Sequence, residues 1–357
     1  MACELAESAA EAVWPSLLEL RRFLSSEEAC QTDQVGFVMS GGKWSFLTSP
    51  NALGEADREG SLQLIIALDE DVASSHNCSV YSHRCFVDGR APIDVVEREL
   101  TDGARAVFRL YLPMLIGGFH ALVRGELFVT AHVAQTLDGR IACHNGQSQW
   151  ISNQANLVHS HRLRALHDGV LVGRRTVEND DPALTVRHVA GVSPRRIVLN
   201  ASAKLITSEA NRYQVFQDDG CLVLSEHDAL ANATPPASLA SSVELVGANL
   251  DEEGTIAPDA LAAALTQRGL NSIFIEGGSQ TISKFFTRDC IDILHVHIAP
   301  VILGSGISGF ALPVIEHVQH ARRMQMEHFI LDGELLMECR EQPAALAALQ
   351  SSEASTE

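Results

Sequence analysis

Hydrophobic and polar residues follow different patterns in two parts of the chain, which meet near residue 124. After that point, short apolar stretches that predict strands alternate with stretches that predict helices. The predicted strands are 127–134, 170–172, 197–199, 221–224, 243–246, 271–276 and 291–299, and the predicted helices are 152–167, 258–269 and 279–288. Strands that alternate with helices in this way are typical of an α/β fold with a largely parallel sheet.

Residues that begin or end helices support several of these limits. Ser152 is a candidate N-cap for a helix that Gly169 ends, and Pro258 and Gly269 bracket an alanine-rich helix. Near the C-terminus, an Asp-Gly turn joins two apolar stretches, 324–329 and 334–339, and predicts a hairpin. We therefore expect the sheet to end antiparallel.

The first 124 residues carry few regular signals. A helix is predicted at 17–24, a strand at 61–68, and a helical stretch at 93–119 that Gly103 and Pro113 interrupt. The most apolar stretch, 110–123, is too short to cross a bilayer and predicts a buried helix. We divide the chain into an N-terminal accessory region of unknown α+β fold at 1–124, a main domain at 125–341 and a disordered tail at 342–357.

Charge and cysteine content limit the possible partners and the compartment. Twenty-six Lys+Arg against 45 Asp+Glu give a net charge of −19, so we expect neither nucleic acid nor an anionic membrane as a partner. An anionic ligand then needs a local group of cations, mainly arginines, because lysine occurs only at Lys43, Lys204 and Lys284. Eight scattered cysteines and an N-terminus without a basic start predict a cytoplasmic protein.

The strongest local motif is a strand followed by Gly277-Gly278 and a helix. Two glycines allow the backbone to approach a ligand closely, and the N–H groups of Ser279, Gln280 and Thr281 then face that ligand. This arrangement predicts an anion site for a phosphate or pyrophosphate. An ordinary tight turn explains the same segment equally well.

Three further motifs have both a functional and a structural interpretation. The G-x-G-x-x-G run at 304–309 is followed by Pro313 instead of a helix, which favours a loop over a dinucleotide site. T-L-D-G-R at 136–140, with G-Q-S-Q-W at 146–150, fits either a lid over a flat ring or a surface loop. Asp180-Asp181 before a proline fits either a metal- or substrate-orienting pair or a capped turn.

A zinc site is not expected. The residues His76, Cys78, His83 and Cys85 resemble zinc ligands, but single-residue spacings on both sides fit no common site. The H-x-E and P-C-x-x-C strings of zinc nucleobase deaminases do not occur in the chain. We therefore predict no metal and no deaminase activity.

Taken in order, several segments resemble one family. TLDGR, GQSQWIS, the helix that ends near Arg164, VLVGRRTVENDDPALTVR, RIVLN, IFIEGGSQT and HIAPVILGSG are similar to the reductase domain of riboflavin-biosynthesis pyrimidine deaminase/reductases, from about residue 127 to 340. The resemblance implies a dihydrofolate-reductase-like mixed sheet flanked by helices, usually in a homodimer. It also implies that the domain at 125–341 uses NADPH to reduce the ribosyl group of 5-amino-6-(5-phosphoribosylamino)uracil to ribityl.

The same resemblance implies site residues. NADP contacts correspond to Ala134, Trp150, Thr176, Asp180, Ala201, Gly278, Ser279, Gln280 and Thr281, and substrate contacts correspond to Ser148, Arg164, Leu184, Arg187 and Glu276. Asp180, Glu276 and His132 are the candidate catalytic residues. In this interpretation the first two orient the ring and sugar, and Arg164 with Arg187 supplies cations for the 5′-phosphate.

The chain also departs from the family. His132 stands where a lysine is usual, and it either holds the substrate as a protonated cation or packs as a neutral ring. Arg174-Arg175 either meets the cofactor 2′-phosphate or is solvated. Residues 1–124 do not resemble the family's deaminase domain, so a separate protein would have to deaminate the substrate. The alternatives are a reductase of another pterin or pyrimidine in specialised metabolism and a non-catalytic NADP-binding regulator.

Overall fold

The computed structural model describes most of the chain. The described residues are 3–32, 34–40, 43–49, 51–53, 56, 62–67, 82–87, 91–97, 100–149, 151–206, 210–218, 220–236, 239 and 243–341, and within 62–97 the description is of the backbone alone. The chain divides into two compact units, one made of Met1–His120 with Ile315–Glu357 and the other of Ala121–Val314. The division into domains at 124 and 341 stays a prediction.

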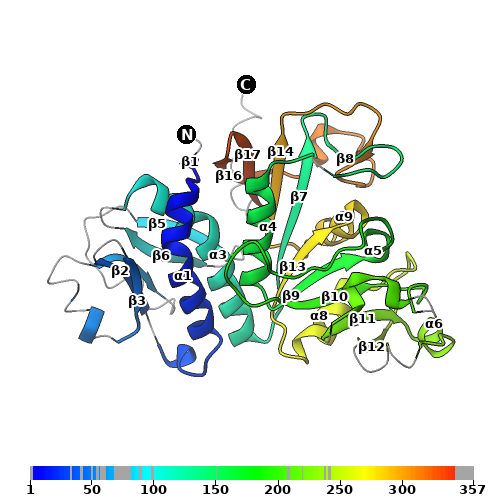
Figure 1. Ribbon diagram of the computed structural model, residues 1–357, viewed down its shortest axis with the longest axis horizontal. Helices are drawn as coiled ribbons and strands as arrows, with labels where there is room; N and C mark the ends of the chain where they lie inside the picture. Colours follow the sequence, from blue (N-terminus) through cyan, green and yellow to red (C-terminus); the bar gives the residue numbers. More distant parts are fainter. Residues whose placement is uncertain are drawn as a thin grey trace. The chain divides into compact units, whose positions relative to one another are not determined.

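A parallel sheet forms the centre of the second unit, with the strand order β14-β7-β13-β9-β10-β11-β12 (Figure 1). Each neighbouring pair in this order runs parallel. The strands are β7 (Phe128–Thr136), β9 (Gly169–Gly173), β10 (Arg195–Leu199), β11 (Cys221–Glu226), β12 (Val243–Ala248), β13 (Ser272–Gly277) and β14 (Ile293–Ala299). The predicted α/β class and all seven predicted strands are confirmed. Because the strands are parallel, their carboxyl ends meet at one edge, where α/β folds bind ligands.

Helices connect these strands and lie around the sheet (Figure 1). They are α4 (Gln154–Leu166), α5 (Arg174–Asp180), α6 (His227–Ala231), α8 (Pro258–Thr266) and α9 (Ser279–Thr287), with short 3-10 turns at Ala210–Arg212 and Gln214–Phe216. Pro258 begins α8 and Gly269 follows it with φ +71°, as predicted. The predicted cap of α4 is wrong by one residue. Asn153 is the N-cap, and its side chain accepts the N–H of Asn156 at 2.9 Å.

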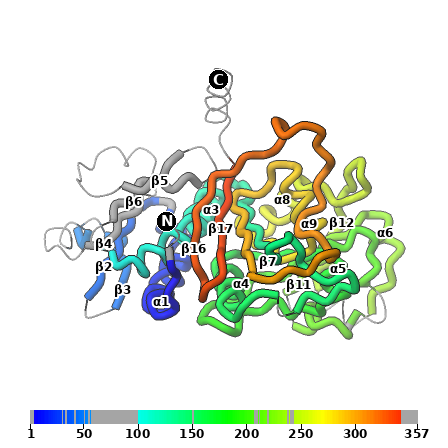
Figure 2. Tube along the Cα trace, turned by 90° about the horizontal axis from the view of Figure 1, so that it is seen from above, coloured from blue at the N-terminus to red at the C-terminus, as the bar shows by residue number. Residues whose placement is uncertain are grey.

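A small antiparallel sheet pairs β8 (Arg140–Ala142) with β15 (Ile307–Ser308). It combines the segment after β7 with the segment after β14, whose orange trace can be followed in Figure 2. No helix follows Gly309 in the described residues 310–317, so the G-x-G-x-x-G run is a loop, as predicted, except for the short strand β15 within it.

The first unit contains helices, a five-stranded sheet in its described part and a hairpin. The sheet order is β3-β2-β4-β6-β5, with every pair antiparallel. Its strands are β2 (Gln34–Ser40), β3 (Lys43–Leu47), β4 (Leu62–Ala67), β5 (Ser82–Val87) and β6 (Ala91–Glu97), and the other elements are β1 (Cys3–Glu4), α1 (Glu7–Leu24), a 3-10 turn at Ala29–Gln31, α3 (Asp102–Arg124), a 3-10 turn at Val318–His320, β16 (Met324–Leu331) and β17 (Glu334–Glu341). The predicted helix at 17–24, strand at 61–68 and hairpin are confirmed.

The predicted helical stretch at 93–119 is wrong in two respects. Its first part is strand β6, and α3 then runs without a break through Gly103 and Pro113. Gly103 lies in the first turn of α3, where an added Cβ would come 2.8 Å from the Cβ of Ala9. The helix around Pro113 is deeply buried, with Tyr111 and Met114 fully enclosed, and tertiary packing of this kind supplies most of the stability of a helix in a protein.

Helix α3 is long and apolar enough, by length and composition, to cross a membrane. However, 72% of its apolar window is buried inside the protein, as expected for the core helix of a globular domain. The prediction of a buried helix therefore holds, although the helix is longer than the apolar stretch that predicted it.

Four buried histidines lie together in the second unit. His132 on β7 and His159 on α4 have ring centroids 5.4 Å apart, and His159 Nε2 is 3.1 Å from Nδ1 of His295 on β14. His297, also on β14, has its ring 6.4 Å from that of His132. Burial, together with the neighbouring histidines, lowers the pKa of His132 and of His159 well below 6.5.

These two histidines make the protein less stable in acid. Because their folded-state pKa values are lowered, the unfolded chain binds protons first as the pH falls below about 6.5, and each histidine then removes about 1.4 kcal/mol of unfolding free energy per pH unit. Urea unfolding between pH 5 and 7 should give a slope that His132→Gln reduces by about one histidine's share. The exposed control His328→Gln should leave the slope unchanged. An equal slope in His132→Gln and the wild-type protein would contradict this account.

Candidate active site

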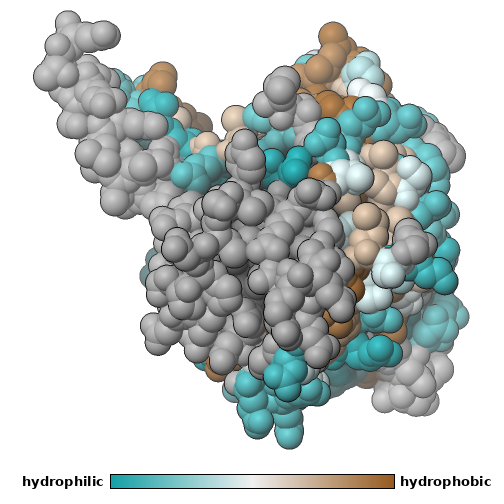
Figure 3. Space-filling view, turned by 90° about the vertical axis from the view of Figure 1, so that its left-hand side faces the viewer, coloured by the Kyte–Doolittle hydropathy of each residue, from teal (hydrophilic) through white to brown (hydrophobic). Residues whose placement is uncertain are grey.

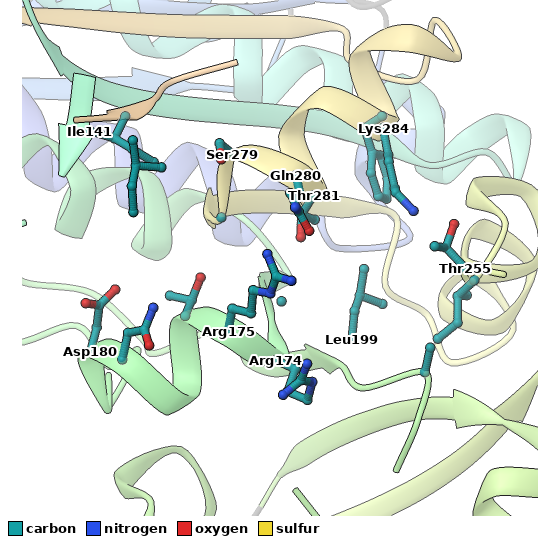
Figure 4. Close-up of a pocket in the computed structure, with 18 of the residues that line it drawn as sticks. Ile141, Arg174, Arg175, Asp180, Leu199, Thr255, Ser279, Gln280, Thr281 and Lys284 are labelled. Carbon is teal, nitrogen blue, oxygen red and sulfur yellow. The ribbon is translucent and has the colours of Figure 1, made fainter. Parts of the chain in front are cut away.

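A cavity of about 470 Å³ opens at the carboxyl edge of the parallel sheet, within the second unit. Its walls come from the ends of β9 and β10, from α5 and α9, from the β8 region and from the segment around 251–258 (Figure 4). The lining residues are Ile141, Ala142, Gly146, Ser148, Gly173, Arg174, Arg175, Thr176, Asn179, Asp180, Leu199, Ala201, Ser202, Asp251, Thr255, Ile256, Pro258, Gly278, Ser279, Gln280, Thr281, Lys284, Phe285, Arg288 and Ile307. A cavity of this size accommodates a cofactor or a comparable small molecule.

Two glycines bring the starts of α5 and α9 together at this cavity. An added Cβ on Gly173, before α5, would lie 2.7 Å from Oγ1 of Thr281. Gly278, the N-cap of α9, has φ +81°, and a Cβ there would lie 3.2 Å from Oγ1 of Thr176. The first N–H groups of α9 lack helical acceptors and line the cavity at Ser279, which makes this wall favourable for an anion.

Glu276 lies at a β-bulge. The register of β13 against β9 shifts between Ile275 and Gly277, and such bulges re-aim side chains at the ends of strands. The Glu276 carboxylate is bound by both Nε and Nη2 of Arg164 on α4, with a distance of 2.6 Å from Nε to Oε2. Arg164 Nη1 also donates to the carbonyl oxygen of Thr185 at 2.7 Å. The Arg164 side chain is only 6% exposed and is paired with Glu276, and its contact with a substrate phosphate stays a prediction.

The segment after α5 carries the other predicted substrate residues. Leu184 is buried with φ +56°, and the exposed Arg187 donates from Nη1 to Oγ1 of Thr185 at 3.2 Å. His161 on α4 accepts the backbone N–H of Arg187 at Nδ1, at 3.0 Å. Burial and the nearby Arg164 lower the pKa of His161 to about 3, so the ring is neutral and holds this segment by its lone pair.

The adjacent carboxylates Asp180 and Asp181 serve different purposes. Asp180 lines the cavity, with Ser148 Oγ 3.5 Å from its Oδ1, and burial raises its pKa. Asp181 has φ +41° and ends α5, and its carboxylate accepts the N–H of Gln214 at 2.7 Å. The capped-turn interpretation therefore applies to Asp181, whereas Asp180 lies at the cavity, and its contact with a ligand stays a prediction.

The cavity brings together most of the predicted cofactor residues and one predicted substrate residue, Ser148. Thr176, Asp180, Ala201, Gly278, Ser279, Gln280 and Thr281 all line it. Ala134 does not line it, and Trp150 lies outside the described residues. Arg164, Leu184, Arg187 and Glu276 are grouped by their own contacts around Thr185 and α4 and do not line this cavity. Their roles stay predictions.

Sequence reasoning missed two cations of the cavity, Lys284 on α9 and Arg288, the residue that follows this helix. Positions 281, 284, 285 and 288 share one face of a helix, so the spacing after the Gly-Gly turn could have indicated them. Arg288 is bound to Asp251 at 2.8 Å, whereas among the described residues neither Lys284 nor Arg175 forms an ion pair. In the predicted Arg174-Arg175 pair, Arg174 donates to both carboxylate oxygens of Glu178 at 2.6 Å.

His132 is not among the cavity residues and is only 5% exposed. Burial lowers the pKa of the ring well below its usual value, which disfavours a cation at this position near pH 7. The neutral, packed interpretation agrees with the contacts of the ring. Whether His132 has any role in catalysis stays a prediction.

The model of the RibD C-terminal domain matches residues 127–332, more than half of the chain, and this range contains the whole cavity. The chain belongs to this family. The protein is thus a member of the riboflavin-biosynthesis pyrimidine reductase family, and its fold class is the dihydrofolate-reductase-like one that the sequence predicted.

Curated relatives agree with this family. The chain is 28% identical over 219 residues to riboflavin biosynthesis protein RibD of Bacillus amyloliquefaciens, which covers 58% of this chain but only 56% of that protein. It is 33% identical over 185 residues to the 2,5-diamino-6-ribosylamino-4(3H)-pyrimidinone 5′-phosphate reductase of Methanothermobacter thermautotrophicus, covering 50% of this chain and 79% of that one. The chain therefore spans about half the length of the RibD relatives that it matches.

Solved structures extend the likeness in fold beyond the reductase domain. The deaminase/reductase of Thermotoga maritima aligns with 94% of this chain and 99% of its own, with a TM-score of 0.57 and 20% identity. Acinetobacter baumannii RibD aligns over the same shares with a TM-score of 0.58 and 17% identity. The absence of zinc stays a prediction, since His76 and Cys78 lie outside the described residues and only the backbone is described at His83 and Cys85.

The buried Arg164–Glu276 pair should matter more to stability than the surface pair Arg174–Glu178. Removing one partner of a buried pair leaves an uncompensated charge, so Arg164→Met should cost about 3 kcal/mol of unfolding free energy. Arg174→Met should cost less than about 1 kcal/mol, because its side chain is 29% exposed. Adding Glu276→Gln to Arg164→Met should recover at least half of the loss in urea unfolding. Equal costs for the two arginines would show that the first pair is not a buried one.

Proposed function

We propose that the protein reduces the ribosyl group of 5-amino-6-(5-phosphoribosylamino)uracil to ribityl, with NADPH as hydride donor, in riboflavin biosynthesis. The observation that carries the proposal is the cavity within the family match, whose lining includes the start of α9, Asp180 and Ser148. Figure 4 shows Ser279 and Asp180 among the residues around it. A flat nucleotide with a diphosphate fits such a wall, because helix N-termini bind phosphate groups.

The chemistry asks mainly for positioning. The ribosylamine opens to an imine, C1′ of the sugar accepts a hydride, and NADPH supplies that hydride when bound. In our proposal Asp180 and Ser148 orient the ring. Glu276, whose carboxylate is bound by Nε and Nη2 of Arg164, stabilises the protonated imine. The apolar side chains of Ile141 and Ile307 limit the access of water.

In this proposal Arg187 binds the substrate phosphate. Arg164 is already occupied by Glu276 and the carbonyl of Thr185, whereas the Arg187 side chain is exposed. A guanidinium suits bidentate recognition of phosphate. The neutral His161 accepts the backbone N–H of Arg187 and so fixes the backbone position from which the Arg187 side chain extends.

Cofactor recognition divides between two cations. Arg175 reaches toward Gln280 and Thr281 at the start of α9, and Lys284 points into the cavity nearer Thr255 (Figure 4). We propose that Arg175 meets the diphosphate and that Lys284 meets the 2′-phosphate. The acidic protein thus concentrates cations locally where its ligand is anionic.

We retain a homodimer, a cytoplasmic location and a separate deaminase as parts of the proposal. The described surface in Figure 3 mixes hydrophilic and hydrophobic residues. Large apolar side chains stay exposed along one segment of the second unit, at Val301, Ile302, Ile307, Leu312 and Val314. Exposed apolar groups of this kind favour a protein–protein contact.

Turnover tests the proposal directly. The purified protein should oxidise NADPH only when 5-amino-6-(5-phosphoribosylamino)uracil is present, followed by nicotinamide absorbance. Arg187→Ala should raise the KM for this substrate by at least about tenfold, since a charge-assisted hydrogen bond contributes about 1.5–3 kcal/mol, and should leave the Kd for NADPH unchanged. Arg323→Ala, an exposed arginine of the other unit, is the control.

Other outcomes would favour the alternatives. Turnover only with the 2,5-diamino pyrimidinone would give the chain the substrate named for the Methanothermobacter relative. NADPH binding without turnover on either compound would leave a reductase of another pterin or pyrimidine, or a regulator. Loss of NADPH binding in Arg187→Ala would assign that arginine to the cofactor.

The two proposed cation roles predict different effects on NADPH and NADH. The wild-type protein should bind NADPH at least about tenfold more tightly than NADH, a difference of about 1.4 kcal/mol. Lys284→Gln should weaken NADPH alone, whereas Arg175→Gln should weaken both dinucleotides equally. Arg174→Gln is the matched control and should change neither, because Glu178 already binds that arginine. Fluorescence titration measures each Kd, and equal wild-type constants would refute the 2′-phosphate assignment.

A further inference from the structure

Two motifs that supply no polar group to the proposed reaction are bound to each other. T-L-D-G-R follows β7 and the glycine-rich run follows β14, and these strands pair in parallel up to Thr136 and Ala299. The two segments therefore leave the sheet at the same edge. Leu137 N donates to the carbonyl oxygen of Val301 at 2.9 Å, and Gly309 N donates to that of Gly139 at 3.0 Å.

The Asp138 carboxylate is the strongest link between the two segments. Oδ1 accepts Thr136 Oγ1 at 2.5 Å and the N–H of Leu303 at 3.2 Å, and Oδ2 accepts the N–H of Gly304 at 2.6 Å. The bond from Thr136 and those from the two N–H groups lower the pKa of Asp138 to about 2. All three partners donate, so the position needs a group that only accepts.

The paired segments form a flap, defined here as residues 136–142 and 303–309. Its strands β8 and β15 have three and two residues, too few to pair stably by themselves. The two strands approach closely at Gly306, where no side chain would fit. An added Cβ on Gly306 would lie 2.3 Å from the carbonyl oxygen of Ala142. Arg140 Nε also donates to the carbonyl oxygen of Gly304 at 2.9 Å.

The flap contributes directly to the cavity. Ile141, Ala142 and Ile307 are lining residues, and Figure 4 places Ile141 across the cavity from Asp180 and beside Ser279. Asp138 itself is not a lining residue. Any effect of Asp138 on a bound ligand must therefore act through the position of the flap.

We propose that Asp138 is a positioning residue that holds the flap closed over the cavity and thereby sets the affinity for the nicotinamide dinucleotide. The assignment of the ligand rests on the proposed function, whereas the contact of Asp138 with the flap does not. An ionised carboxylate preorganises the wall before the ligand arrives, so less order has to be gained on binding. This assigns one purpose to both the T-L-D-G-R motif and the glycine-rich run.

Asp138→Asn tests the proposal, because the amide NH2 replaces one acceptor with a donor that faces other donors. We expect the Kd for NADPH to rise about tenfold and the backbone amides of Leu303, Gly304 and Gly309 to lose protection from hydrogen exchange. Amides of β9 to β11 should keep their protection, which a general loss of folding would not allow. Asp332→Asn, in the Asp-Gly turn of the β16–β17 hairpin, is the matched control and should change neither measurement.

Gly306→Ala opens the flap independently of Asp138, since its Cβ would overlap Ala142. It should reproduce both the weaker binding and the loss of protection. A normal Kd in either variant, with the flap amides exposed, would overturn the proposal. If the wild-type protein binds no NADPH, the proposed function fails, and the exchange measurement alone decides whether Asp138 holds the flap.

Discussion

The parallel pairing of β9 with β13 is the constraint on which the site depends. Because both strands run in the same direction, the helices that follow them, α5 and α9, begin at the same edge. Their starts can touch only where side chains are absent, which accounts for Gly173 against Thr281 and for the positive φ of Gly278. The bulge at the end of β13 then turns Glu276 toward Arg164. The pairing of β9 with β13 thus places the start of α9, which is favourable for an anion, only a few residues after the fixed Glu276 carboxylate.

Electrostatics at this edge follow from a protein that is acidic overall. A cation can bind an anionic ligand only where no carboxylate already pairs with it. The ion pairs of an arginine therefore say more about its role than its position at the cavity does. Arg174 is bound to Glu178 at i+4, Arg288 to Asp251, and Arg164 to Glu276. Arg175, Arg187 and Lys284 form no ion pair among the described residues, which is why our proposal assigns anionic ligand groups to them. The pairing of each cation with a neighbouring carboxylate, and not the net charge of the protein, therefore distinguishes the proposed anion-binding positions from the other cations.

The sequence predicted the parallel sheet well and the first unit poorly, for a physical reason. Strands buried on both faces are continuous apolar runs, such as β9 and β11, and capped helices separate them. The antiparallel strand Lys43–Leu47 alternates exposed and half-buried residues and gives no such run. Pro113 indicated a break that burial of the surrounding helix overrides. The Gly-Gly turn was visible because backbone geometry is local, whereas the pairing of Arg164 and the pKa of His132 depend on tertiary neighbours.

His132 links the departure from the family to the packing of the sheet. A lysine at this position would put an ammonium group beside His159, His295 and His297, in a layer where desolvation already disfavours charge. A neutral imidazole instead packs against the ring of His159. The buried layer therefore favours a neutral residue at 132, and our proposal takes the cation for the substrate from outside the layer. Arg187 meets that condition, because its side chain is exposed while His161 fixes its backbone.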